Sequence, residues 1–246
     1  MKKSMLAIAA AAVIAVGCSK KSEAKVLTVG ATPEPHAAIL NLLVDDLAKE
    51  GITLKVQEFT DYVVPNEAVE SGQIDANYFQ HLPYMESFNK ERGFHLVSVA
   101  GIHIEPLALY SHKIKSIDDL KSGSVIAIPN DPTNGGRALM LLAKAGLITI
   151  PENNFKVTVQ DIQSNPKHLQ FIELEAAQLP RSLSDVDIAV ITMNYVMSGG
   201  LDVGKQGIFL EDKTEPLAVM VLAAREKDKD NEAYQKIAKI FLTQHS

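Results

Sequence analysis

Cysteine, tryptophan and positive charge are all scarce in this sequence of 246 residues. Cys18 is the only cysteine, so the chain cannot form an internal disulfide. No tryptophan is present, and the formal net charge is −6 at pH 7. Because a nucleic-acid surface needs an excess of positive charge to meet the phosphates, we expect no nucleic-acid partner.

The motifs of several enzyme classes are missing as well. The chain has no GxSxG, no P-loop, no HExxH and no GxGxxG after a predicted strand. Its seven histidines are spread from His36 to His245 without metal-ligand spacing, which leaves open only a zinc site assembled in space. The sequence therefore indicates a protein that is not an enzyme, and it assigns no cofactor and no metal ligand.

A long apolar run is found only at the amino terminus. Residues 5–16 are apolar and follow the basic start MKK, which is the pattern of a secretion signal. A run of about 12 residues is too short to span a bilayer, where about 20 are needed. We therefore predict that residues 1–17 are a signal peptide and that no transmembrane helix remains after its removal.

Cys18 directly ends this apolar run, in the sequence AVGC. AVGC resembles a lipoprotein processing box, in which the cysteine thiol receives diacylglycerol; plain secretion with cleavage nearby is the alternative. Residues 18–25 are then a lipidated, flexible tether. We expect a lipoprotein of the cell membrane or outer membrane that faces the periplasm or the cell exterior.

Strand-like and helix-like patterns alternate along the rest of the chain, whose hydrophobic content of 46% is ordinary for a globular protein. Such alternation predicts mostly parallel sheets covered by helices. We expect an α/β protein with lobe 1 at 26–110, lobe 2 inserted at 111–208, a return to lobe 1 at 209–246, and a ligand cleft between the lobes. The predicted strands include 26–33, 52–59, 74–79, 95–111, 124–130, 155–162, 169–176, 187–192, 207–212 and 216–226.

One arginine stands near the start of a predicted helix at 131–146, in NDPTNGGRALMLLAKAG. Asp131 can cap this helix, and the backbone N–H groups of its first turn favour an anion. Arg137 adds a guanidinium fork that fits a carboxylate. The alternative is a surface arginine whose stem lies over the sheet.

Aromatic residues gather in DANYFQHLPYMESF, in a chain that contains only 6% of them. Phe79, His81 and Tyr84 can wall a pocket for an apolar or thioether side chain. Phe79 and Tyr84 can equally be core residues, and Phe88, four positions after Tyr84, fits the core best.

Two further candidates, Tyr62 and Asn194, stand in loops where a predicted strand leads into a helix. Such loops are where ligands are met in doubly wound sheets. Either residue can instead be part of a helix cap.

These stretches together resemble a known family. VLTVGATPEPHAAIL, FTDYVVPNEAV, IDANYFQHLPYMESF, IHIEPLALYS, IAIPNDPTNGGRAL, ELEAAQLPRSL and GIFLEDK occur in this order behind a lipoprotein signal. The chain resembles, over nearly its whole mature length, the methionine-binding lipoproteins of bacterial ABC importers, the NlpA lipoprotein family. The resemblance implies a two-lobed, type II periplasmic-binding-protein-like fold that closes on one amino acid and delivers it to a permease and its ATPase.

The resemblance also implies roles for individual residues. Arg137 would bind the carboxylate of a methionine-like ligand, and Asn194 would hold its polar end. Asn134 would belong to the same site, and the protein would act as a monomer. Tyr62, Phe79, His81 and Tyr84 would wall the pocket for the ligand's side chain.

The chain departs from the family at Val219, in EPLAV, where the family usually has an asparagine that completes the site. It also ends in KIFLTQHS, where relatives usually continue with another helix, so it is either a truncated product or a shorter member. Losing the hydrogen bond that the family asparagine would make to a charged ligand group costs about 1.5–3 kcal/mol. The departure at Val219 favours an alternative function, a lipoprotein of the same fold with altered or lost ligand binding that acts as a surface antigen or adhesin.

Cys18 is expected to become the lipidated first residue of the mature protein. Intact-mass spectrometry of the native protein should show diacylglycerol on this residue, because it is the only cysteine and ends the apolar run. Cys18→Ala should release soluble protein that still folds, since the anchor lies outside the predicted lobes. An unmodified Cys18, or a mature chain that starts elsewhere, would contradict the prediction.

Overall fold

The computed structural model describes residues 25–151, 155–212 and 214–244. The predicted signal peptide and Cys18 lie outside the described residues. Within the described part of the chain, no helix combines the length and the apolar character needed to cross a membrane.

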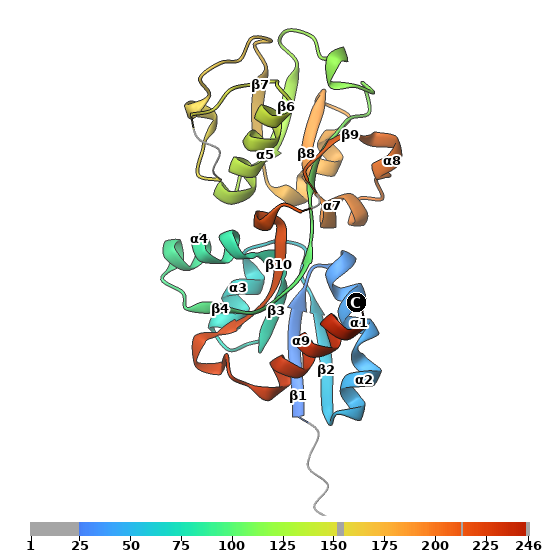
Figure 1. Cartoon of the computed structure of the whole chain (residues 1–246), viewed down its shortest axis with the longest axis vertical. Coiled ribbons are helices and arrows are strands. Elements are labelled where there is room, and N and C mark those ends of the chain that lie inside the picture. Colours follow the sequence, from blue (N-terminus) through green and yellow to red (C-terminus); the bar gives the residue numbers. More distant parts are fainter. Residues whose placement is uncertain (1–24, 152–154, 213, 245–246) are drawn as a thin grey trace, which may run out of the picture.

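Strands and helices alternate through most of the chain (Figure 1). The strands are β1 (Lys25–Ala31), β2 (Ile52–Glu58), β3 (Ala76–His81), β4 (Leu96–Ile104), β5 (Leu107–Tyr110), β6 (Val125–Pro129), β7 (Gln170–Leu174), β8 (Ile188–Thr192), β9 (Gly207–Leu210) and β10 (Val219–Arg225). The helices are α1 (Ala38–Leu42), α2 (Val44–Lys49), α3 (Val64–Glu70), α4 (Leu82–Arg92), α5 (Pro132–Lys144), α6 (Leu179–Ser182), α7 (Met193–Ser198), α8 (Val203–Gln206) and α9 (Glu232–Gln244), and a helical turn η1 (Pro33–Ala37) precedes α1.

The strands form two five-stranded sheets that lie one above the other in Figure 1. The first sheet has the order β2-β1-β3-β10-β4 and the second the order β7-β6-β8-β5-β9. Each sheet is mixed, because β10 runs antiparallel to β3 and β4, and β5 runs antiparallel to β8 and β9. The two-lobed α/β fold is as expected, because in each sheet four strands run in the same direction and only β10 or β5 runs against them.

The chain crosses between the sheets twice. The predicted strand at 95–111 is split at Glu105 and Pro106: β4 belongs to the first sheet and β5 to the second. β9 also pairs with β5, so the return to the first sheet lies between β9 and β10. The crossings therefore lie beside 105–106 and 211–218, a few residues from the expected positions near 110 and 208.

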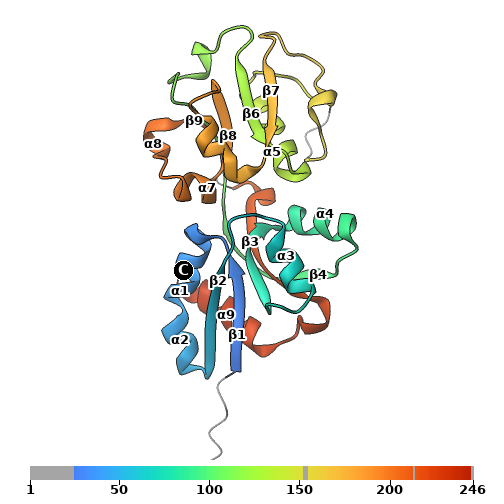
Figure 2. The same cartoon turned by 180° about the vertical axis from the view of Figure 1, so that it is seen from behind.

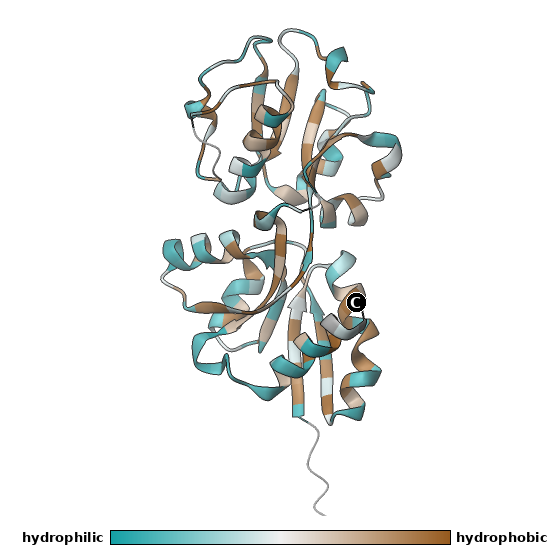
Figure 3. Ribbon diagram, in the orientation of Figure 1, coloured by the Kyte–Doolittle hydropathy of each residue, from teal (hydrophilic) through white to brown (hydrophobic). Residues whose placement is uncertain are grey.

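Helices cover both faces of each sheet, as Figures 1 and 2 show from opposite sides. Helices α1, α2 and α9 pack on one face of the first sheet, and α3 and α4 pack on the other. In the second lobe α5 covers one face, and α6 and α7 cover the other. Figure 3 shows the resulting pattern, with mainly hydrophobic strands and a mainly hydrophilic α4.

One predicted strand is wrong. The segment 155–162 contains no strand among its described residues, but only a short helical turn at Val159–Asp161. Its alternating apolar residues Val157, Val159 and Ile162 pack against the α5 side of the second sheet instead of pairing with a strand. Period-two alternation therefore arose here from a loop with one buried side.

The α5 helix starts as the sequence predicts. The Asp131 side chain caps it by accepting a hydrogen bond from the Asn134 backbone N–H at 2.9 Å, and Pro132 is its first residue. Gly136 is required by close packing, because a Cβ atom built there would lie 1.9 Å from the Phe155 carbonyl oxygen. The loop that contains Phe155 therefore rests directly on the α5 backbone.

Replacing Gly136 by Ala should lower the free energy of unfolding by roughly 1–3 kcal/mol, because the added methyl group cannot fit without moving the Phe155 backbone. Urea unfolding followed by circular dichroism measures the change. Gly204→Ala in α8 is the control, since its nearest neighbour is the end of the flexible Asp202 side chain. Equal stability of the two variants would show that the loop moves away freely.

Candidate functional site

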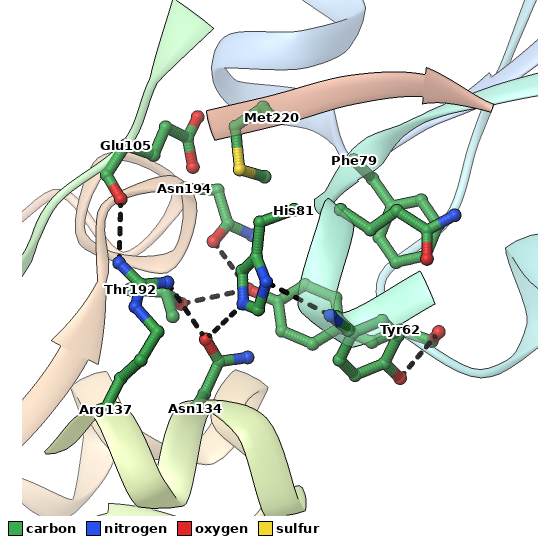
Figure 4. Close-up of a pocket in the computed structure, with 11 residues that line it drawn as sticks. Tyr62, Phe79, His81, Glu105, Asn134, Arg137, Thr192, Asn194 and Met220 are labelled. Atoms are coloured by element: carbon green, nitrogen blue, oxygen red, sulfur yellow. Dashed lines mark hydrogen bonds between the residues drawn. The ribbon is translucent and has the colours of Figure 1, made fainter. Parts of the chain in front are cut away.

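A small cavity lies between the two lobes, at the level where the chain crosses from one sheet to the other. Its free volume of about 20 Å³, measured for the centre of a water-sized sphere, is enough for about one water molecule. Figure 4 shows the side chains that converge on it from β3, α4 and β10 on one side and from α5, β8 and α7 on the other. The lining residues are Tyr62, Phe79, Gln80, His81, Tyr84, Glu105, Asn134, Arg137, Thr192, Asn194 and Met220.

All seven residues predicted to form the site line this cavity. The sequence analysis missed Gln80, Glu105, Thr192 and Met220. Of these, Glu105 carried a signal, because an acidic residue inside the apolar stretch IHIEPLALYS is unusual. The resemblance places residue 219 in the site. In the structure Met220 lines the cavity, whereas the Val219 side chain lies against Gly101.

Tyr62 forms the centre of the aromatic wall. Its ring lies 5.7 Å from Phe79, 5.8 Å from Tyr84 and 5.0 Å from Tyr195, measured between ring centroids. Its hydroxyl donates to Asn194 Oδ1 at 2.6 Å and lies 2.9 Å from Thr192 Oγ1. Because Tyr62 follows β2 while its partners belong to the second lobe, this side chain bridges the two lobes (Figure 4).

Phe88 shows the alternative outcome for an aromatic residue. It packs between Tyr84 and Phe94, with ring-centroid distances of 6.0 and 5.7 Å, and does not line the cavity. Phe88 is therefore a core residue, as its helical spacing from Tyr84 indicated.

A chain of hydrogen bonds connects His81 to the start of α5. Burial, and next the charge of Arg137, lower the pKa of His81 to about 3, so its ring is neutral at pH 7. Its Nδ1 accepts from the Tyr84 backbone N–H at 3.2 Å, which leaves Nε2–H to donate to Asn134 Oδ1 at 2.9 Å. The Asn134 amide in turn donates to both carboxylate oxygens of Asp131 at 3.1 Å. Thus a helix cap orients a cavity-lining amide.

Arg137 is buried, with only 2% of its side chain exposed, and its guanidinium already has a carboxylate partner. Nη2 donates to Glu211 Oε2 at 2.5 Å and Nε donates to Glu211 Oε1 at 3.3 Å, a two-point contact. Nη1 donates to Asn134 Oδ1 at 3.2 Å, and Nη2 also donates to the Glu105 carbonyl at 3.2 Å. The alternative of an exposed surface arginine is therefore wrong.

These contacts join Arg137 to both crossings between the lobes. Glu105 stands in the outgoing crossing and Glu211 at the start of the return. The two crossings also bond to each other: the Leu107 backbone N–H donates to Glu211 Oε2 at 2.8 Å, and the Glu105 backbone N–H donates to the Ala218 carbonyl at 2.9 Å. One buried guanidinium from α5 thus holds the double-stranded hinge beside the cavity.

Comparison with known proteins now identifies the family. The model of the NlpA lipoprotein family matches residues 27–245. The chain belongs to the NlpA lipoprotein family. The resemblance noted in the sequence and the two-lobed fold of substrate-binding proteins are thereby confirmed.

Several relatives in this family are named for methionine. The D-methionine-binding lipoprotein MetQ of Escherichia coli (strain K12) is 47% identical over 78% of this chain and 72% of its own length. A probable D-methionine-binding lipoprotein MetQ of Vibrio cholerae is 43% identical over 98% of this chain and 91% of its own. A nutrient-binding protein from Burkholderia cenocepacia, solved bound to methionine, superposes with a TM-score of 0.82 at 44% identity, covering 88% of this chain and 91% of that one.

Glu211→Gln should lower the free energy of unfolding by about 3–5 kcal/mol, because it leaves the buried Arg137 charge without its counter-ion. Urea unfolding at fixed pH and salt measures this. Glu67→Gln is the matched control: its partner Arg92 lies 3.3 Å away, and both side chains are about half exposed, so the loss should stay below about 1 kcal/mol. Similar losses in the two variants would show that the Arg137–Glu211 pair contributes no more to the free energy of unfolding than an exposed pair does.

Proposed function

We propose that this chain is the lipid-anchored substrate-binding protein of an ABC importer and that it captures methionine or a closely related amino acid. The observation that carries the proposal is a buried hydrogen-bond donor in the cavity. Asn194 Nδ2 has no hydrogen-bond partner among the described residues, although Tyr62 fixes the orientation of its amide. A buried donor without a partner is costly, and a ligand that accepts its hydrogen bond would remove the cost.

A second donor stands on the same side of the cavity. Hydrogen bonds to other described residues use four of the five N–H groups of Arg137, which leaves one N–H of Nη1. Together with Asn194 Nδ2 it offers two donors from the second lobe to a ligand carboxylate. Arg137 would then bind the ligand through Nη1 while Nε and Nη2 bind Glu211 in the hinge.

The cavity also offers groups that suit an ammonium group and an apolar side chain. Glu105 lines it with a carboxylate that is only 6% exposed, and a buried negative charge attracts a cation strongly. Tyr62, Phe79, Tyr84 and Met220 add aromatic and thioether surface, which favours a methionine-like side chain. Both signs of charge and an apolar wall fit a zwitterionic amino acid, in accord with the names of the relatives.

Partners and location follow from the same proposal. The ligand would pass to a membrane permease and its ATPase, and the protein would act as a monomer held on the membrane by lipid on Cys18. It would face the periplasm or the cell exterior. The buried polar groups that line the cavity support ligand capture over the alternative of a surface antigen or adhesin with lost binding.

Isothermal titration calorimetry on the detergent-solubilised protein with L- and D-methionine and other amino acids tests the proposal. Asn194→Ala should weaken binding roughly ten- to a hundredfold, the effect of losing one hydrogen bond to a charged group. Tyr62 would keep Thr192 as a partner in this variant. Asn41→Ala, on the exposed side of α1, is the control and should bind as the wild type does.

Two results would refute the proposal: no heat of binding from any amino acid in the panel, or unchanged affinity in Asn194→Ala. The first would remove the receptor function, and the second would remove Asn194 from the site.

A further inference from the structure

Two histidines and a glutamate converge beside the cavity, at the crossing between β4 and β5. Glu105 Oε1 lies 3.3 Å from His36 Nε2 and 3.0 Å from His103 Nε2. The three ligand atoms all lie within 4.8 Å of one another. His36 comes from η1 and His103 from β4, which are separated by most of the first lobe's sequence, so no sequence spacing could show the cluster.

Each imidazole is held by an oxygen on its far side. Thr32 Oγ1 lies 2.7 Å from His36 Nδ1, and the Tyr78 hydroxyl lies 2.5 Å from His103 Nδ1. Both Nε2 atoms are therefore directed at Glu105. In metal-binding histidines the second ring nitrogen donates to such an oxygen; here His103 Nε2–H donates to the Glu105 carboxylate, so a metal ion would replace that proton while Nδ1–H donated to Tyr78.

His36 directs an unsatisfied buried atom into the cluster. Its side chain is fully buried, and its Nε2 has no hydrogen-bond partner among the described residues, although it points at Glu105. If Nδ1–H donates to Thr32, the Nε2 lone pair faces a carboxylate; if Nε2 carries the proton, its N–H is left without a well-aligned acceptor. Either tautomer leaves a buried polar atom poorly satisfied, which is unfavourable.

We propose that His36 Nε2, His103 Nε2 and the Glu105 carboxylate bind a divalent transition-metal ion, with zinc as the best match. Two imidazoles and one carboxylate are a zinc ligand set, and they leave a fourth position open to water. Ligands about 2.0–2.1 Å from a tetrahedral zinc ion lie about 3.4 Å apart, so the two distances from Glu105, 3.3 and 3.0 Å, fit, whereas the third separation of up to 4.8 Å would shorten when the ion binds. His103 is 26% exposed on the edge strand β4, which gives the ion a route from solvent.

The test measures zinc binding by the chelator-treated, detergent-solubilised full chain in the absence of any amino acid. Calorimetry with Zn²⁺ should give one ion per chain, and Co²⁺ should give the strong visible absorption of a tetrahedral site. His36→Gln and His103→Gln should each weaken binding by at least about a hundredfold, since each removes a ligand. His95→Gln is the control, because His95 is an exposed histidine of the same lobe, with 73% of its side chain accessible.

Tyr78→Phe is a second variant that still tests the proposal if the histidine variants misfold. It keeps all three ligands and the aromatic ring but removes the hydroxyl that orients His103, so zinc affinity should fall about ten- to a hundredfold. Absence of stoichiometric zinc uptake by the wild type overturns the proposal, as does wild-type affinity in both histidine variants. Because no amino acid is present, these outcomes are independent of whether the protein binds methionine.

Discussion

The need to neutralise one buried positive charge organises the centre of this protein. Arg137 is almost fully enclosed, and an enclosed guanidinium is tolerated only when its N–H groups have acceptors and its charge has a partner. Those acceptors are drawn from places far apart in the sequence: Asn134 in its own helix, the Glu105 carbonyl, and the Glu211 carboxylate. Satisfying Arg137 thus requires α5, both crossings and the cavity wall to meet at one point, so the geometry of the hinge and that of the cavity depend on each other.

Glu105 is the second residue whose contacts join several parts of the structure. Its backbone carbonyl serves Arg137, its backbone N–H bonds to Ala218, and its carboxylate faces both the cavity and two histidines. Burial lowers the pKa of His36 to about 4, so this histidine does not neutralise the carboxylate at pH 7. A cation from outside the chain would balance it, and the proposed ammonium group and metal ion would then compete for the same charge.

The sequence predicted the local features well because local chemistry determines them. Asp131 caps α5 as expected, and the seven site residues meet around one cavity, since strand-to-helix loops of two lobes face each other across a cleft. Contacts over long sequence separations were not predictable. Nothing in the sequence pairs Arg137 with Glu211, or His36 with His103, because these contacts depend on how the lobes are connected. The strand expected at 155–162 failed for a related reason: its buried side meets a helix, whose backbone it approaches at Gly136, and not a neighbouring strand.

If lipid on Cys18 anchors the protein, as proposed, the position of Lys25 determines which end of the molecule faces the anchor. Lys25 begins β1 at the end of the first lobe that lies farthest from the second lobe (Figure 1). Any force transmitted through the residues before Lys25 therefore acts on that distant pole, along strands whose opposite ends carry the cavity. The first lobe would stay with the membrane while the second turned about the hinge. In a chain tethered in this way, rotation of the outer lobe would not need to move the anchor.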